Sequence, residues 1–221
     1  MAETKRPSGR RLRLRVKRAL DFTIAGLSLA VLAPFIAAMA TLVAITTGRP
    51  VLFKQVRLGQ DGRPFTLLKF RTMSDARDDE GNLLPDGKRI TRTGRVLRQW
   101  SLDELPTLLN VLRGEMSLVG PRPLLPEYWS LYSPTQRRRH ELPPGIAGPV
   151  PAHGRNSLSW EEKFDLDVWY VDNWSLRLDA KTFARTLWKA MTREGVSADG
   201  HATMPRFEGS PSSPENLGGR G

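Results

Sequence analysis

The longest apolar stretch of the chain is Phe22–Gly48, which contains no charged residue and has basic residues at both ends. A membrane-spanning helix needs about 20 apolar residues, so this stretch is long enough to cross a bilayer. Because basic flanks favour the cytoplasmic side, both ends are expected there, which predicts a reentrant hairpin over residues 21–48. Pro34 is the expected break, since proline removes an amide donor and clashes with the preceding helical turn.

Three other interpretations of this stretch stay open. A single-pass anchor fits the apolar pattern equally well, because kinked spanning helices are common. A secretory signal is suggested by Ala38-Met39-Ala40 and Arg10-Arg11, although the apolar residues continue beyond the cleavage position that this motif would give. A buried core helix would not need so long an apolar stretch between basic flanks.

Two shorter apolar segments, Val51–Arg57 and Pro64–Arg71, follow the long stretch and are joined by a loop containing Asp61-Gly62. Asp-Gly between such segments predicts a β-hairpin. Alternation along the second strand places Lys69 and Arg71 on the same face. Both are candidates for binding phosphate, and both are also compatible with solvated edge charges that discourage aggregation.

A helix is predicted to begin near Asp103, because leucines recur at helical spacing after it, at Leu105, Leu108, Leu109 and Leu112. With Asp103 as the cap, Pro106 falls in the first turn, where a missing amide hydrogen costs little. A helix start would direct backbone amides at Asp103 and Glu104, keep an aspartate ionised and attract phosphate. The same residues are also explained by a purely structural capping box between Ser101 and Glu104.

An arginine between two prolines, Arg122, follows soon after this helix. The prolines restrict its backbone, and the planar guanidinium can hold two oxygens of one phosphate. A rigid cation near the carboxylates of Asp103 and Glu104 suits a phosphate ester. The three residues are therefore the first candidates for a functional site.

Charge and composition favour a membrane-attached protein over a nucleic-acid binder. The net charge is +11 and there is no cysteine, so a disulfide framework and a cysteine metal site are excluded. Most of the excess positive charge lies in residues 1–20, a basic arm that suits anionic lipid headgroups. We expect a mixed, helix-rich α/β catalytic domain over residues 49–208 and a disordered tail over residues 209–221, where Gly, Ser and Pro dominate.

Several motifs together resemble the bacterial sugar transferase family, the monotopic phosphoglycosyl transferases. The central ones are Ser101–Pro106 and Asn110–Pro123. The resemblance extends over roughly Arg18–Phe207 and includes four further segments, namely Lys69–Met73, Arg139-His140, Gly154–Asn156 and Phe164–Asp167. Departures from the family pattern are Ala33 before Pro34, where many members have serine, and the segment Gly148–His153.

The resemblance implies an enzyme that transfers a sugar 1-phosphate from a UDP-sugar to undecaprenyl phosphate and releases UMP. It implies that Asp103 is the nucleophile of a covalent phosphosugar intermediate and that Glu104 completes the dyad, with Mg²⁺ at these two carboxylates. Substrate phosphates would be bound by Arg122, Lys69, Arg71 and Arg155, although Arg155 would equally suit a structural role beside Asp165 or Asp167. The reentrant helix would hold the catalytic domain at the cytoplasmic face of the inner membrane.

The ending Gly195–His201 is similar to family members that transfer N,N′-diacetylbacillosamine phosphate for protein glycosylation. This similarity suggests a UDP-N,N′-diacetylbacillosamine donor. The alternatives are a glucose or galactose 1-phosphate transferase that initiates exopolysaccharide or capsule synthesis, and a catalytically inactive membrane-anchored scaffold. Partners suggested beyond the substrates are a second copy of the chain and downstream glycosyltransferases.

Overall fold

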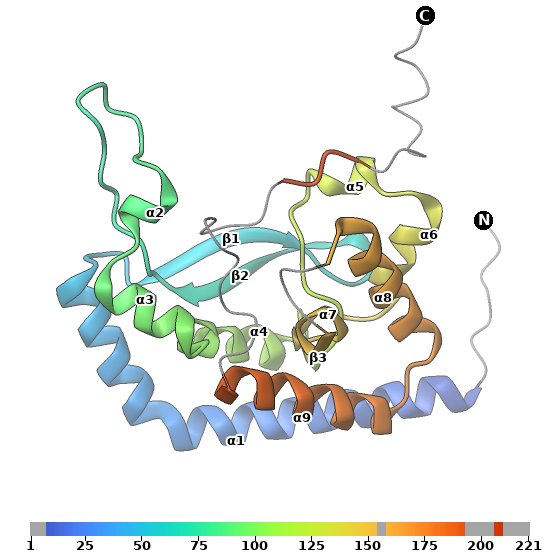
Figure 1. The fold of residues 1–221 in the computed structure, drawn as a ribbon. Helices are drawn as coiled ribbons and strands as arrows, with labels where there is room; N and C mark the ends of the chain where they lie inside the picture. Colours follow the sequence, from blue (N-terminus) through green and yellow to red (C-terminus); the bar gives the residue numbers. More distant parts are fainter. Residues whose placement is uncertain (1–7, 154–157, 193–205, 210–221) are drawn as a thin grey trace, which may run out of the picture.

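The computed structural model describes residues 8–153, 158–192 and 206–209. Within these residues the fold is mixed and helix-rich, as the sequence predicts, and it contains two small two-stranded sheets, of which only the first was predicted (Figure 1). The elements in chain order are α1 (Ser8–Thr46), β1 (Leu52–Leu58), η1 (Gln60–Gly62), β2 (Pro64–Phe70), α2 (Asp86–Arg89), α3 (Arg92–Gln99), η2 (Leu102–Thr107), α4 (Leu108–Arg113), β3 (Ser117–Val119), α5 (Tyr128–Leu131), α6 (Pro134–Arg137), η3 (Arg138–Glu141), β4 (Gly145–Ala147), α7 (Pro149–His153), α8 (Trp160–Asp172) and α9 (Leu176–Thr192).

Helix α1 runs beneath the rest of the molecule and contains the apolar stretch together with much of the basic arm. Pro34 lies inside this helix, which changes direction in its second half (Figure 1) but is not interrupted. The predicted break is therefore a bend, because losing one backbone hydrogen bond does not end a helix whose other turns stay bonded. The predicted basic arm, residues 1–20, is likewise not separate from the helix, because α1 already begins at Ser8.

One face of α1 packs on the domain, while its other face is exposed. Ala25 and Val43 are fully buried, whereas Val31 and Ile45 are 75% and 78% exposed. By length and composition, α1 could cross a membrane. So large an apolar surface is unusual on a water-soluble monomer and indicates contact with lipid or a partner.

Charged residues of α1 fix this helix to the domain. Lys17 is buried and donates hydrogen bonds to the backbone carbonyl of Val119 at 2.9 Å and to Asp179 at 2.6 Å. Arg18 donates to two backbone carbonyls at the end of α4, and Asp21 accepts a backbone N–H of β3 at 3.1 Å. The expectation that the basic arm serves lipid headgroups is therefore wrong for Lys17 and Arg18, which bind protein.

The predicted β-hairpin is confirmed, with β1 and β2 antiparallel. Its loop contains Asp61 and Gly62, both with positive φ, at 55° and 73°. This conformation is the reason that an Asp-Gly pair suits a tight turn between strands.

The outer edge of β2 is covered by side chains from η2 and α4. Asn110, fully buried, accepts the N–H of Leu68 at 3.1 Å and donates to the carbonyl of Thr66 at 2.7 Å. The hydroxyl of Thr107 donates to the carbonyl of Leu68 at 2.8 Å. These bonds satisfy backbone groups that an edge strand would otherwise leave unpaired, and they hold η2 beside β2.

The parallel pair β3–β4 positions the loop that carries Arg122. Gly120 and Gly145 approach so closely that a Cβ added to Gly145 would lie 2.0 Å from the backbone nitrogen of Gly120. Glycine is therefore needed here for close packing of two backbones. The next residues, Pro121–Pro123, leave β3 directed toward the hairpin.

Candidate active site

A cavity of about 690 Å³ lies between the β-hairpin, η2, the Arg122 loop and α8. Its size falls in the range of small-molecule sites, which is about 300–1,000 Å³. The predicted residues that line it come from distant parts of the sequence, namely Lys69, Arg71, Asp103, Glu104 and Arg122. Arg155 lies outside the described residues, so its predicted role is untested.

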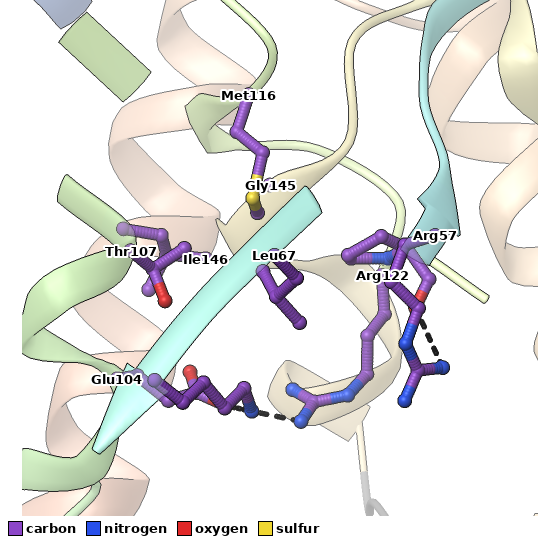
Figure 2. Close-up of a pocket in the computed structure, with 10 residues that line it drawn as sticks. Arg57, Leu67, Glu104, Thr107, Met116, Arg122, Gly145 and Ile146 are labelled. Atoms are coloured by element: carbon purple, nitrogen blue, oxygen red, sulfur yellow. Dashed lines mark hydrogen bonds and ion pairs between the residues drawn. The ribbon is translucent and has the colours of Figure 1, made fainter. Parts of the chain in front are cut away.

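Glu104 is the centre of an ion-pair network. Its Oε1 accepts hydrogen bonds from Nζ of Lys69 at 2.6 Å and from Nη2 of Arg122 at 3.0 Å. Figure 2 shows Arg122 reaching across the pocket toward Glu104 from the opposite side. Lys69 is thus not a solvated edge charge, because its side chain is turned inward and only 19% exposed.

Asp103 lines the same cavity but differs from Glu104 in its hydrogen bonds and ion pairs. No hydrogen bond or ion pair joins its carboxylate to any side chain that the structure describes, and the residue is 9% exposed. Burial raises the pKa of Asp103, and the neighbouring charge of Glu104 raises it further, while Lys69, Arg98 and Arg122 oppose this rise. The expected helix start does not form at Asp103, so burial and the charge of Glu104 decide the direction of its pKa shift.

The local backbone explains this difference from the sequence prediction. Residues Leu102–Thr107 form a 3₁₀ helix, and the α-helix begins only at Leu108. Ser101 has a left-handed backbone with φ of 55°, and its side chain makes no capping hydrogen bond. The predicted capping box is therefore absent and Asp103 is not a cap, which removes the structural explanation for the dyad.

Arg71 follows the end of β2 and binds three residues from two segments of the protein. Its guanidinium donates to the backbone carbonyls of Met73 at 2.9 Å and Arg49 at 2.7 Å, and it pairs with Asp75 at 2.5 Å. Its donors are engaged, so the geometry favours a role in shaping the rim of the cavity. Direct phosphate binding by Arg71 stays a prediction.

Two further arginines near the dyad, Arg57 and Arg98, were not identified from the sequence as site residues. Arg57 lies beside Arg122 in Figure 2, and burial together with the charge of Arg122 lowers the pKa of Arg57 to about 10. Arg98 lies on α3 and donates from Nε to the hydroxyl of Thr72 at 2.9 Å. Alternation along the hairpin could have identified Arg57, since it shares a strand face with the inward-facing Lys69.

Cations outnumber carboxylates around the dyad. Four cationic side chains line the cavity near two carboxylates, namely Arg57, Lys69, Arg98 and Arg122 against Asp103 and Glu104. Arginine and lysine donors in a partly buried site bind phosphate oxygens strongly. The arrangement therefore suits a substrate with two phosphates.

The dyad also fits a metal site that substrate completes. No cluster of three or more His, Cys, Asp or Glu occurs among the described residues, so these residues offer no fully protein-made cage. Mg²⁺ commonly binds through one or two carboxylates together with substrate phosphates and water. Asp103 and Glu104 can supply those carboxylates. His140 does not line the cavity that contains the dyad, and its Nδ1 lies 3.0 Å from the carbonyl of Gly59.

Comparison with known proteins agrees with this geometry. Residues 12–193 match the family described as bacterial sugar transferase. Similar proteins include the uncharacterized sugar transferase EpsL of Bacillus subtilis, 54% identical over 88% of this chain and 96% of that protein. The UDP-glucose:undecaprenyl-phosphate glucose-1-phosphate transferase of Caulobacter vibrioides is 38% identical over 87% of this chain and 77% of its own. The UDP-galactose-lipid carrier transferase of Erwinia amylovora is 36% identical over 82% of this chain and 41% of its own.

The family match extends over most of the sequence, from the start of α1 to the end of α9, and includes every described residue of the dyad network. This chain belongs to the bacterial sugar transferase family and is an enzyme of that kind.

Proposed function

We propose that this enzyme transfers a hexose 1-phosphate from a UDP-hexose to undecaprenyl phosphate and releases UMP. The names of the Caulobacter and Erwinia relatives support glucose or galactose as the sugar. They give no support to the N,N′-diacetylbacillosamine donor that the C-terminal sequence suggested, so the hexose alternative takes its place. The lipid-linked hexose that forms would be the first sugar of an exopolysaccharide or a capsule.

The observation that carries this proposal is the contrast between the two dyad carboxylates. Glu104 is neutralised by Lys69 and Arg122, whereas Asp103 faces the cavity without a hydrogen-bonding partner among the described side chains. A carboxylate that reacts must have an oxygen available to the substrate. Asp103 meets this requirement, whereas Glu104 is already paired with two cations through its Oε1.

In the first step, a carboxylate oxygen of Asp103 attacks the phosphorus atom that bears the sugar. The bond from this phosphorus to the bridging oxygen breaks, and UMP leaves with the electron pair. The product is an acyl phosphate that joins Asp103 to the sugar phosphate. In the second step, an oxygen of undecaprenyl phosphate attacks the same phosphorus, which restores the carboxylate and forms undecaprenyl-diphosphate-sugar. An acyl phosphate is reactive enough for this transfer.

The surrounding side chains stabilise the charge on the transferring phosphoryl group. Arg122 and Lys69 are close enough to the dyad to shift from Glu104 to phosphate oxygens when substrate binds. Mg²⁺ held at the dyad would neutralise the diphosphate and stabilise the departing UMP. Glu104 positions both cations before substrate arrives.

We place α1 in the cytoplasmic leaflet of the inner membrane as a reentrant helix. The exposed apolar face of α1, its bend after the first half, and the exposed residues of α9 beside it support this placement (Figure 1). The chain has no cysteine, so a single cysteine introduced at Ala2 or Ser210 is the one thiol of the purified variant after labelling of intact cells. Labelling from opposite sides of the membrane would contradict the reentrant topology.

The reaction is tested with purified enzyme, undecaprenyl phosphate, Mg²⁺ and a panel of UDP-sugars, with UMP release as the readout. We expect activity with UDP-glucose or UDP-galactose and its loss in Asp103→Asn. Asp86→Asn is the matched control, because Asp86 also lines the cavity but pairs with Arg89 at 2.6 Å on its rim. Full activity of Asp103→Asn, or no UMP release with any donor, would refute the proposal.

A further inference from the structure

Helix α8 contributes a wall to the cavity that contains the dyad. One face of this helix contributes four residues to the cavity lining, namely Trp160, Lys163, Phe164 and Asp167. Val150 and Pro151 of α7 line the same cavity. Arg122 and Lys69 account for the phosphates of a nucleotide sugar, whereas the α8 wall has no role in the reaction described above.

Asp167 is the most unusual residue of this wall. It is 2% exposed, and its Oδ2 accepts two hydrogen bonds from Arg139, from Nε at 3.0 Å and from Nη2 at 2.6 Å. Its other oxygen, Oδ1, is buried without a hydrogen-bond partner. A buried carboxylate oxygen left without a partner is unfavourable, so this atom is suited to accept a donor from a bound molecule.

The packing of Arg139 explains why Oδ1 is left over. The guanidinium lies near the rings of Tyr132 and Phe164, at 5.9 Å and 5.7 Å from their centroids. It also donates from Nη2 to the backbone carbonyl of Arg122 at 2.7 Å. Held in this way, Arg139 bonds to one oxygen of Asp167 instead of both, and it connects α8 directly to the Arg122 loop.

An aromatic wall flanks this carboxylate. The rings of Trp160 and Phe164 are stacked with centroids 5.6 Å apart. Phe207, 4% exposed, packs behind them with its centroid 5.0 Å from that of Phe164. A flat apolar surface next to a hydrogen-bond acceptor is typical of sites that bind a hydroxylated ring.

We propose that Oδ1 of Asp167 accepts a hydrogen bond from a hydroxyl-bearing ring of the nucleotide sugar, while the diphosphate lies at Arg122 and Lys69. This inference rests on the proposed function and adds the subsite for the ring. Carboxylates bind ribose hydroxyls in this way in nucleotide sites. The ring is either the ribose or the transferred hexose, which share the same hydroxyl chemistry, and Arg139 ties its subsite to the phosphate site.

The assignment is tested with Asp167→Asn in the full-length enzyme in detergent. Binding of UDP, UDP-glucose and pyrophosphate is measured by isothermal titration calorimetry. The amide oxygen can still accept from Arg139, which places an NH₂ group where Oδ1 was, so a ring hydroxyl loses its acceptor. Because a hydrogen bond to a charged group is lost, the Kd of the affected ligand should rise about 10- to 100-fold. The Kd of pyrophosphate, which has no ring, should not change. Asp172→Asn, an exposed acid of the same helix paired with Arg138, is the control.

The ligands distinguish the two rings. Weaker binding of UDP by Asp167→Asn identifies the ribose, whereas unchanged UDP binding with weaker UDP-glucose binding identifies the hexose. Equal affinity of the variant and the wild type for both ligands would overturn the proposal and leave Oδ1 with water only. Equal weakening for pyrophosphate would also overturn it, since the effect would then be general.

If Asp167→Asn does not fold, wild-type enzyme answers the same question with altered ligands. Binding of UDP is compared with binding of 2′-deoxy-UDP and 3′-deoxy-UDP, and binding of UDP-glucose with that of its deoxyglucose analogues. A loss of about 10-fold or more for one missing hydroxyl supports the subsite, and no loss for any of them refutes it. These experiments measure binding and not turnover. If a hydroxyl is needed for binding but no UMP is released, the transferase proposal fails and the ring subsite stands.

Discussion

Asn110→Ala is the sharpest test of how the fold positions the dyad. The side-chain amide of Asn110 is fully buried and bonds to two backbone groups of β2, the N–H of Leu68 and the carbonyl of Thr66. Alanine leaves both without a partner. A buried unsatisfied group costs about 1–3 kcal/mol, and the carbonyl of Thr66 lies nearer the surface, so we expect a total loss of about 3 kcal/mol. For a chain of this length that corresponds to a fall in Tm of about 6–12 °C.

The assay is thermal unfolding in detergent micelles, followed by UMP release at a temperature where both proteins are folded. Thr107→Val is the matched control, because it removes a single hydrogen bond, from the hydroxyl to the carbonyl of Leu68, and should cost about 1 kcal/mol. We also expect Asn110→Ala to lower kcat, since α4, which continues directly from η2, loses its bonds to β2. A Tm within about 1 °C of wild type would refute the reasoning, because it would mean that β2 does not need these bonds.

Three other predictions concern the site and the surface. Glu104 raises the pKa of Asp103, so Glu104→Gln should move the acid limb of the kcat/KM profile for UMP release to lower pH; an unmoved limb would argue against Asp103 as the titrating nucleophile. Phe207→Ala should lower the unfolding free energy by about 3 kcal/mol and raise KM for the UDP-sugar more than it lowers kcat, as measured by denaturation and steady-state kinetics; equal effects on both constants would indicate a merely structural role. Leu187 on α9 is 52% exposed, so Leu187→Asp should weaken vesicle binding in flotation assays without changing Tm in detergent, and unchanged flotation would place α9 away from lipid.

Features with a short-range signal were predictable from the sequence. The hairpin follows from alternation around Asp61-Gly62, and its observed pairing agrees with that prediction. Asp103, Glu104 and Arg122 were identified as one site, and the structure brings them to one cavity. These residues lie in short contiguous motifs, and the chemistry of each side chain can be recognised without knowing its tertiary contacts.

Features that depend on tertiary contacts were not predictable in this way. The left-handed backbone of Ser101 replaces the expected cap, because η2 is held by its bonds to β2 and not by its own start signal. The Arg139 and Asp167 pair joins residues 28 positions apart, and nothing in either neighbourhood specifies it. The burial of Asp103, which raises its pKa, was likewise not predictable, because it depends on the whole cavity wall.

The attachment of α1 couples the proposed membrane helix to the chemistry. Lys17 bonds to the carbonyl of Val119, three residues before Arg122, and to Asp179 of α9. Asp179 also accepts the hydroxyl of Tyr170 from α8, so three helices meet at one buried carboxylate. With Arg18 holding the end of α4 in addition, these bonds connect the proposed membrane helix to the segments that carry the dyad. The acceptor phosphate of a lipid sits at a fixed depth, so a connection of this kind would hold the dyad at the level where that phosphate is found.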